Sequence, residues 1–241
     1  MLSIFQKGFH YSQDGPGNRL IYHLQGCNLR CPWCSNPEGL QPKGGTAYPV
    51  SELIDEVFRS RPMFFDGGGV TLTGGEVTMQ ADGALKLLSA VHEKGISTCI
   101  ETNGISDRLP ELFPYIDVLI MDVKHYDVDK HRQMTGLCNE QTIKNLSLAI
   151  EAKKNIIVRI PLIGGFNASI EDAHGFVELF LNLGLDKHSS VELLPYHEYG
   201  KKKYEDLGMK YTMNENAKIT ADMLSIFSDV LIQRGIKLIR T

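Results

Sequence analysis

Short apolar segments alternate with amphipathic ones along most of this 241-residue chain. The pattern predicts strands at residues 20–25, 69–73, 97–101, 117–122, 156–160, 191–194 and 236–240. Helices are expected near residues 51–61 (with Ser51 as the cap), 81–94, 109–115, 141–153, 169–183 and 216–234, while residues 1–19 are expected to be turn-rich. Such alternation is typical of parallel strands joined by right-handed crossovers. With six β–α units rather than eight, the sequence predicts an α/β fold with an open, partial (β/α)6 TIM-like barrel and a parallel sheet.

The composition sets limits on the class of protein. With 42% hydrophobic and 22% charged residues, the chain has enough apolar residues for one sizeable core. No linker or low-complexity segment interrupts residues 1–241, so a single domain is expected. A formal net charge of −4 does not favour a nucleic-acid partner. No apolar run approaches the length of a membrane span, and the N-terminus lacks the pattern of a signal peptide, so a cytoplasmic protein without a membrane partner is expected.

The cysteines provide the most specific chemical signal. Three of the five form a C-x3-C-x2-C triplet, with an aromatic residue, Trp33, before its last member: Cys27, Cys31 and Cys34. Soft thiolates suit zinc or an iron–sulfur cluster. Both a structural zinc site and a cubane cluster usually take four protein ligands, so a triplet leaves one metal corner for another molecule. Cys99 is expected in the core and Cys138 in a loop, both outside the metal site.

Polar residues gather where the predicted strands end. These are Cys27, Gly74–Glu76, Glu101–Gly104, Asp122–Lys124, Arg159 and Tyr196–His197. The carboxyl ends of parallel strands open on one face, where active sites of such folds are built. Taken singly, each group has a simpler interpretation: glycines mark turns, charged residues form rim salt bridges, and a histidine can lie on the surface. Arg159 stands within an apolar strand, which is costly unless the charge is paired.

The triplet with Trp33 resembles the cluster motif of the radical SAM superfamily. Further segments extend the likeness to the glycyl-radical-enzyme activating enzymes, nearest to the pyruvate formate-lyase type. They are Asp14–Gly17 with Arg19, residues 67–76, Thr102–Gly104, Asp122–Lys124, Arg159 and residues 193–201. The segments follow one another in the family's order along most of the chain.

The resemblance implies a radical SAM fold with one 4Fe–4S cluster on Cys27, Cys31 and Cys34, the residues on which catalysis depends. In this family S-adenosylmethionine (SAM) chelates the open iron, and its reductive cleavage provides a 5′-deoxyadenosyl radical that removes a hydrogen atom from a glycine of a partner enzyme. The implied cofactor-binding residues are Trp33, Gly74, Gly75, Glu76, Glu101, Asp122, Lys124, Arg159 and His197. Asp14 and Arg19 are expected beside the incoming glycyl loop. The expected partners are pyruvate formate-lyase and an electron donor, either a flavodoxin or a ferredoxin.

Two features bear on the subtype. No cysteine lies between Cys34 and Ser51, so the ferredoxin-like insert of many activases is not expected. The pyruvate formate-lyase type has an aspartate where this chain has Glu101, and that aspartate helps to hold a monovalent cation beside SAM. The resemblance therefore implies a cation near Glu101 and Asp122, approached here by a side chain one methylene longer. Ser35 stands where histidine is common in the family.

Two alternatives stay open at the level of the sequence. One is a radical SAM enzyme that acts on a small molecule, of the carboxy-deazaguanine synthase type, which would be active without any protein substrate. The other is a zinc protein that uses the cysteines structurally. Iron and sulfide content after anaerobic purification separates the zinc alternative from both radical SAM hypotheses.

Overall fold

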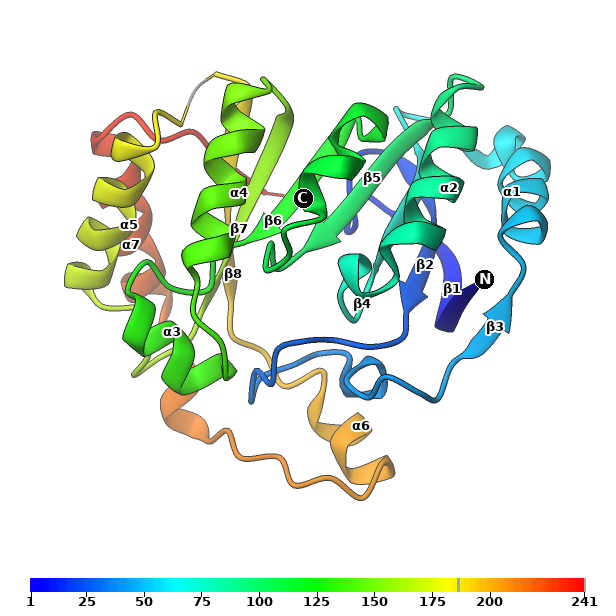
Figure 1. The fold of residues 1–241 in the computed structure, drawn as a ribbon. Coiled ribbons are helices and arrows are strands. Elements are labelled where there is room, and N and C mark those ends of the chain that lie inside the picture. Colours follow the sequence, from blue (N-terminus) through cyan, green and yellow to red (C-terminus); the bar gives the residue numbers. More distant parts are fainter. Residues whose placement is uncertain (186, 241) are drawn as a thin grey trace. The chain divides into compact units, whose positions relative to one another are not determined.

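The computed structural model describes residues 1–185 and 187–240 and divides into two compact units (Figure 1). The first unit comprises Met1–Asn28 and Glu38–Ile120, and the second comprises Leu29–Pro37 and Met121–Arg240. The loop that carries the cysteine triplet passes from one unit to the other. Cys27 therefore belongs to the first unit, whereas Cys31 and Cys34 belong to the second.

The first unit is built on a mixed sheet. Its strands run in the order β3 (Thr46–Tyr48), β1 (Leu2–Tyr11), β2 (Asn18–Leu24), β4 (Gly69–Gly74) and β5 (Ser97–Thr102). β1 is antiparallel to both of its neighbours, while β2, β4 and β5 are parallel. Because Leu24 pairs with Gly74, and Leu72 with Ile100, the carboxyl ends of the three parallel strands meet at one edge. β6 (Val118–Asp122) begins as this unit ends.

Two helices, each with apolar residues at helical spacing on one face, cover this sheet. α1 (Val50–Arg59) turns Val50, Leu53 and Val57 inward and packs against α2 (Ala81–His92), which lies along β5 (Figure 1). Short 3₁₀ helices occupy Pro37–Gly39, Arg61–Met63, Val77–Gln80 and Leu109–Tyr115.

The second unit has three parallel strands in sequence: β7 (Asn155–Leu162), β8 (Ser189–Pro195) and β9 (Leu238–Ile239). Its helices are α3 (Val128–Thr135), α4 (Glu140–Glu151), α5 (Ile170–Asn182), α6 (Lys201–Asp206) and α7 (Ala221–Gln233), with a 3₁₀ turn at Glu215–Ala217. α5 packs on α7 through the rings of Phe176 and Phe227, 6.1 Å apart. A capping box of Ser169 and Asp172 begins α5, and Thr220 caps α7.

The seven expected strands are all present, with ends shifted by a few residues. The expectation that residues 1–19 are turn-rich holds for residues 12–17 but is wrong for Leu2–Tyr11, which form β1. Ser51 is not a cap either: α1 begins at Val50, after Pro49, and Ser51 lies inside the helix. The helix expected at 216–234 begins at Ala221, and that at 109–115 is a 3₁₀ helix. β3, α3 and α6 were not predicted from the sequence.

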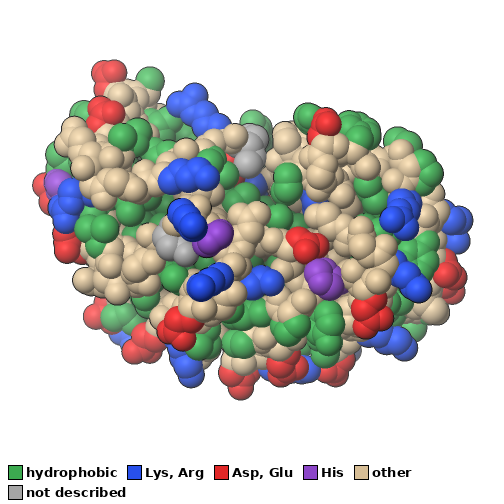
Figure 2. All heavy atoms as spheres, turned by 90° about the horizontal axis from the view of Figure 1, so that it is seen from above, with side chains coloured by type: hydrophobic (Ala, Val, Ile, Leu, Met, Phe, Trp, Pro, Cys, Tyr) green, Lys and Arg blue, Asp and Glu red, His purple; other side chains and the backbone are tan. Residues whose placement is uncertain are grey.

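The surface carries charges of both signs. On the face drawn in Figure 2, Lys and Arg side chains occur together with Asp and Glu side chains, and hydrophobic ones lie between them. This agrees with 25 basic and 29 acidic residues in the chain. Within residues 1–185 and 187–240, no helix combines the length and apolarity needed to cross a membrane.

Candidate functional site

The cysteine loop continues β2 at the carboxyl edge of the first unit's sheet. Its start is held by two backbone hydrogen bonds, from the Gly75 amide to the Leu24 carbonyl (2.8 Å) and from the Glu76 amide to the Gly26 carbonyl (2.7 Å). The thiols of the triplet, like those of Cys99 and Cys138, are free of disulfides. Thiolates are soft ligands of the kind that an iron–sulfur cluster takes.

The part of the loop in the second unit is held by α6 and by an aromatic contact. The Cys34 amide donates to the Cys31 carbonyl (3.1 Å), and Tyr204 on α6 donates its hydroxyl to the same carbonyl (3.4 Å). Burial raises the pKa of Tyr204, and the nearby Cys34 and Cys31 thiols raise it further, so Tyr204 remains a donor. The Trp33 ring lies 5.2 Å from that of Phe166. Tyr204 lies just beyond the recognised segment 193–201, and no sequence pattern indicated its role.

Gly200 permits a close approach to the same loop. A Cβ atom at this position would lie 2.2 Å from the Cys34 carbonyl oxygen, well inside van der Waals contact. The glycine before α6 therefore allows this helix to pack directly on the cysteine loop.

Glu76 connects the carboxyl ends of β4 and β5. Its side chain is 1% exposed and accepts hydrogen bonds from the Thr78 amide and hydroxyl, from the Thr102 hydroxyl (2.8 Å) and from the Asn103 amide (2.8 Å). The carboxylate is thus satisfied by groups of the protein. This places Glu76 in the cluster of strand ends, where it fixes the shape of the edge.

Asn103 links this edge to the first cysteine. Its side-chain amide donates to Asn28 Oδ1 (2.7 Å) and lies 4.0 Å from Cys27 Sγ. Asn28 in turn donates to the Ile105 carbonyl (2.9 Å). Asn103 and Asn28 are therefore positioning residues for Cys27. Asn103 stands within a recognised sequence segment, but no motif indicated a role for either asparagine.

Gly75 is required by the packing of the edge itself. A Cβ at this position would lie 2.1 Å from the Gly26 carbonyl oxygen and 3.0 Å from that of Gly39. We expect Gly75→Ala to push the start of the cysteine loop away from β4, lowering stability by about 1–3 kcal/mol and reducing iron loading. Thermal melting and iron content measure both effects.

The matched control for Gly75 is Gly8→Ala. A Cβ at Gly8 meets no atom within 4 Å, and the backbone there does not require glycine. Gly8→Ala is expected to leave the melting temperature and the iron content unchanged. Equal behaviour of the two variants would contradict the packing role of Gly75.

Glu101 and Asp122, the residues expected near a cation, each have a partner of their own. The Thr73 hydroxyl donates to Glu101 Oε2 (2.5 Å) within the first unit. In the second unit, Lys124 Nζ donates to Asp122 Oδ2 (2.8 Å), and the Lys124 side chain is 11% exposed.

Arg159 on β7 is paired with Glu192 on β8. The two residues are opposite each other in the parallel register, and Arg159 Nε donates to Glu192 Oε2 (2.8 Å). Both side chains are less than a tenth exposed. An arginine charge within an apolar strand is unfavourable to bury unless it is paired, and Glu192 provides this partner.

His197 follows β8. Its ring stacks on Tyr199 at 3.9 Å, and its Nδ1 accepts from the Tyr199 amide (3.3 Å). Burial lowers the pKa of the His197 imidazole, which favours the neutral form of the ring. A neutral ring of this kind can stack on or hydrogen-bond to a ligand without adding charge.

The turn Asp14–Gly17 and Arg19 lie at the other end of the parallel strands, beside the amino ends of β4 and β5. Arg19 is fully buried, and it donates to the Pro16 carbonyl of the turn and to Thr71 Oγ1. The Thr71 hydroxyl donates to the Asp14 carbonyl (2.8 Å). The Asp14 carboxylate is left to contact His10 Nδ1 at 2.5 Å. The buried Arg19 side chain thus supports the turn through these hydrogen bonds.

Comparison with known proteins places this geometry in a family. The family model of the Radical SAM superfamily matches residues 21–177. The choline trimethylamine-lyase activating enzyme of Oleidesulfovibrio alaskensis is 33% identical over 270 residues, with 86% of this chain and 87% of that protein covered. The pyruvate formate-lyase 1-activating enzyme of Escherichia coli is 31% identical over 229 residues, with 93% of this chain and 92% of that protein covered.

Solved structures show the same fold. A domain of the pyruvate-formate lyase-activating enzyme from Bacteroides vulgatus matches with a TM-score of 0.58 at 24% identity, over 71% of this chain and 98% of that chain. A radical SAM methyltransferase from Sphaerobacter thermophilus matches with a TM-score of 0.68 at 15% identity. This match covers 96% of this chain and 67% of that chain. These likenesses show the fold: mixed α/β with mainly parallel strands in a partial barrel-like structure, as expected from the sequence.

Proposed function

Since the chain belongs to the radical SAM superfamily, and within it to the glycyl-radical-enzyme activating enzymes, we propose that it activates pyruvate formate-lyase. It would cleave SAM reductively and remove a hydrogen atom from one backbone glycine of that enzyme. Residues 1–241 would act as a single radical SAM domain in the cytoplasm. Because the chain has no second cluster motif, the electron would come from a separate flavodoxin or ferredoxin.

One observation carries the choice of pyruvate formate-lyase. The match to the pyruvate formate-lyase 1-activating enzyme covers nearly all of both proteins over a length close to that of this chain. The match to the choline trimethylamine-lyase activating enzyme extends over more residues than this chain contains, so that relative carries additional residues. The absence of cysteines between Cys34 and Ser51 also supports the shorter, one-cluster type.

The donor set suits the cofactors of this chemistry. Cys27, Cys31 and Cys34 would hold three irons of a 4Fe–4S cluster, which together with SAM supplies a 5′-deoxyadenosyl radical when both are bound. The protein's own task is to position groups and to exclude water. Glu76 and Asn103 hold the carboxyl edge of the first unit in place, and Asn103 approaches Cys27.

Further residues are proposed to contact SAM. Gly74 and Gly75 offer backbone without side chains to its amino group. Lys124 would meet its carboxylate, while Glu101 and Asp122 would provide carboxylate oxygens for a monovalent cation. His197 and Trp33 would lie along its ribose and adenine, and Arg159, which Glu192 holds in place, would also contact it. Asp14 would meet the incoming glycyl loop.

The test is electron paramagnetic resonance of a glycyl radical. Reconstituted protein is mixed anaerobically with SAM, a chemical reductant and one of three full-length enzymes: pyruvate formate-lyase, choline trimethylamine-lyase or sulfopropanediol dehydratase. The fastest radical formation is expected on pyruvate formate-lyase. A faster reaction on another of the three would reassign the partner. SAM cleavage without a radical on any of them would contradict the proposal and favour a small-molecule substrate.

Asp14 is expected to matter for the partner and not for SAM. Asp14→Asn removes the charge from the one carboxylate of the turn, and radical formation on pyruvate formate-lyase should slow about tenfold, as for one lost charge-assisted hydrogen bond. SAM cleavage driven by reductant alone should stay unchanged. Asp55→Asn, which changes an exposed carboxylate on α1, is the control and should alter neither rate. If Asp14→Asn also lost SAM cleavage to the same extent, the role proposed for Asp14 in partner recognition would be contradicted.

A further inference from the structure

Exposed hydrophobic side chains gather in one part of the first unit. Phe9 and Tyr11 come from β1, and Met63 and Phe65 come from the segment after α1; all four are between 41% and 55% exposed. Tyr11 stacks on Phe65 with ring centres 5.9 Å apart, and Phe9 lies 6.3 Å from the ring of Phe64. We call Phe9, Tyr11, Met63 and Phe65 the aromatic patch. Exposed apolar side chains that cluster in this way mark interaction surfaces more often than single ones do.

The aromatic patch adjoins an open sheet edge. β1 pairs with β2 on one side, and on its other side β3 covers only Leu2–Ile4. Within the described part of the chain, the outer backbone groups of Gln6–Tyr11 therefore have no neighbouring strand. Such an edge is a template for pairing with another chain unless charged side chains defend it.

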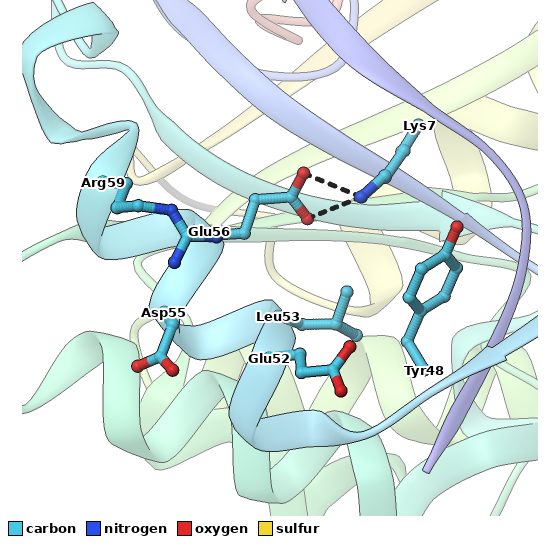
Figure 3. Close-up of a pocket in the computed structure, with 7 residues that line it drawn as sticks. All are labelled: Lys7, Tyr48, Glu52, Leu53, Asp55, Glu56 and Arg59. Carbon is cyan, nitrogen blue, oxygen red and sulfur yellow. Dashed lines mark hydrogen bonds and ion pairs between the residues drawn. The ribbon is translucent and has the colours of Figure 1, made fainter.

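The lysine on this edge is turned aside. Lys7 reaches across to Glu56 on α1, with its Nζ 2.7 Å from the carboxylate, and it also lies over the Tyr48 ring (Figure 3). Since Tyr22 donates to the same carboxylate, Glu56 is itself fixed. The Lys7 charge is therefore engaged with α1, while at the end of β1 the Tyr11 hydroxyl donates to Asp66 Oδ2 (2.9 Å).

The aromatic patch is continuous with the turn Asp14–Gly17. The Ser12 amide, next to Tyr11, donates to the Gly17 carbonyl (3.0 Å). Asn18, directly after the turn, donates its backbone amide to the Phe65 carbonyl (3.1 Å) and its side-chain amide to the Met63 carbonyl (2.8 Å). One network of hydrogen bonds thus holds the aromatic patch and the turn together.

We propose that the aromatic patch and the open edge of β1 form the docking surface for the body of the glycyl-radical enzyme, which contributes an extended apolar segment. The proposal rests on the proposed function, in which the adjoining turn receives the glycyl loop. An extended segment fits because β1 offers both backbone groups and alternate side chains, Phe9 and Tyr11, on one face. A partner body is needed because a loop that leaves its own core binds weakly alone. A second contact beside the turn raises the effective concentration of the loop there.

The test separates docking from chemistry. In the double variant Phe9→Ser with Phe65→Ser, the concentration of pyruvate formate-lyase that gives half the maximal rate of radical formation should rise about tenfold, with the maximal rate within about twofold. SAM cleavage by reductant alone should not change, which also shows that the variant is folded. Activation of a short synthetic peptide with the glycyl-loop sequence should be equally unaffected, because the peptide lacks the docking segment. The control is Ile226→Ser with Ile232→Ser on α7, which removes two equally exposed side chains.

The outcomes distinguish the two proposals. If wild-type protein forms the radical and the double variant keeps the same half-saturating concentration, the docking proposal is overturned and the function stands. If wild-type protein forms no radical on any of the three enzymes, both fall. If sedimentation shows a dimer of this chain that the double variant abolishes while half-saturation is unchanged, the patch is an interface between two copies, which also overturns the proposal.

Discussion

Replacing Cys27, Cys31 or Cys34 by alanine is expected to remove most of the bound iron and all SAM cleavage. The triplet supplies three thiolates, and a fourth corner left open for SAM requires all three to hold the cluster. Asn103 approaches Cys27 through an amide nitrogen, which is a donor and cannot replace a thiolate ligand. Iron and sulfide are measured after anaerobic reconstitution, and SAM cleavage is measured as 5′-deoxyadenosine formed with a chemical reductant.

The chain offers two internal controls. Cys99 is fully buried on β5, and Cys138 lies in the short loop before α4. Cys99→Ala and Cys138→Ala should retain the iron content of the wild type. Iron loss on Cys99→Ala as large as that of the triplet would refute the ligand assignment. Stoichiometric zinc without sulfide in the wild type would instead favour the structural zinc alternative.

The fold was largely predictable because its strands are apolar and regularly spaced. β2 is buried at every position and β6 at all but its last, and each contains consecutive apolar residues in the sequence, Leu20–Tyr22 in β2 and Val118–Met121 in β6. β1 was missed since its outer half is exposed and carries glycine and polar residues, a pattern set by its place at an edge. α3 was missed because it is strongly polar, with only His131 and Thr135 buried.

The candidate site was predictable in its position but not in its internal contacts. Strand ends such as Gly74–Glu76 follow from the alternation of elements along the chain. That Glu76 binds Thr102 and Asn103, or that Arg159 pairs with Glu192, depends on which side chains face each other across neighbouring strands. Tyr204 and Gly200 support the cysteine loop from about 170 residues away in sequence, as the separation of Tyr204 and Cys31 shows. No local pattern signals such a contact.

Arg19 is the clearest case of a residue whose structural role the sequence did not reveal. The guanidinium donates to four backbone carbonyls and two hydroxyls, namely those of Pro16, Gly67, Val70 and Ser97 and those of Thr71 and Ser97. Burial lowers the pKa of Arg19, while the nearby Cys99, Asp117 and Asp14 oppose this shift. The side chain joins the turn Asp14–Gly17 to the amino ends of β4 and β5. Its effect on the glycyl loop would therefore pass through the turn.

Arg19→Met is expected to destabilise the protein by about 3–5 kcal/mol, because the apolar side chain leaves several buried acceptors without donors. For a chain of this length, the melting temperature should fall by about 10 °C. Arg19→Lys should recover only part of this loss, since a single ammonium cannot reproduce the planar fork of donors. Arg132→Met, at an exposed arginine on α3, is the matched control and should have the same melting temperature as the wild type. A melting temperature of Arg19→Met within the error of that control would show that the buried network does not hold the turn in place.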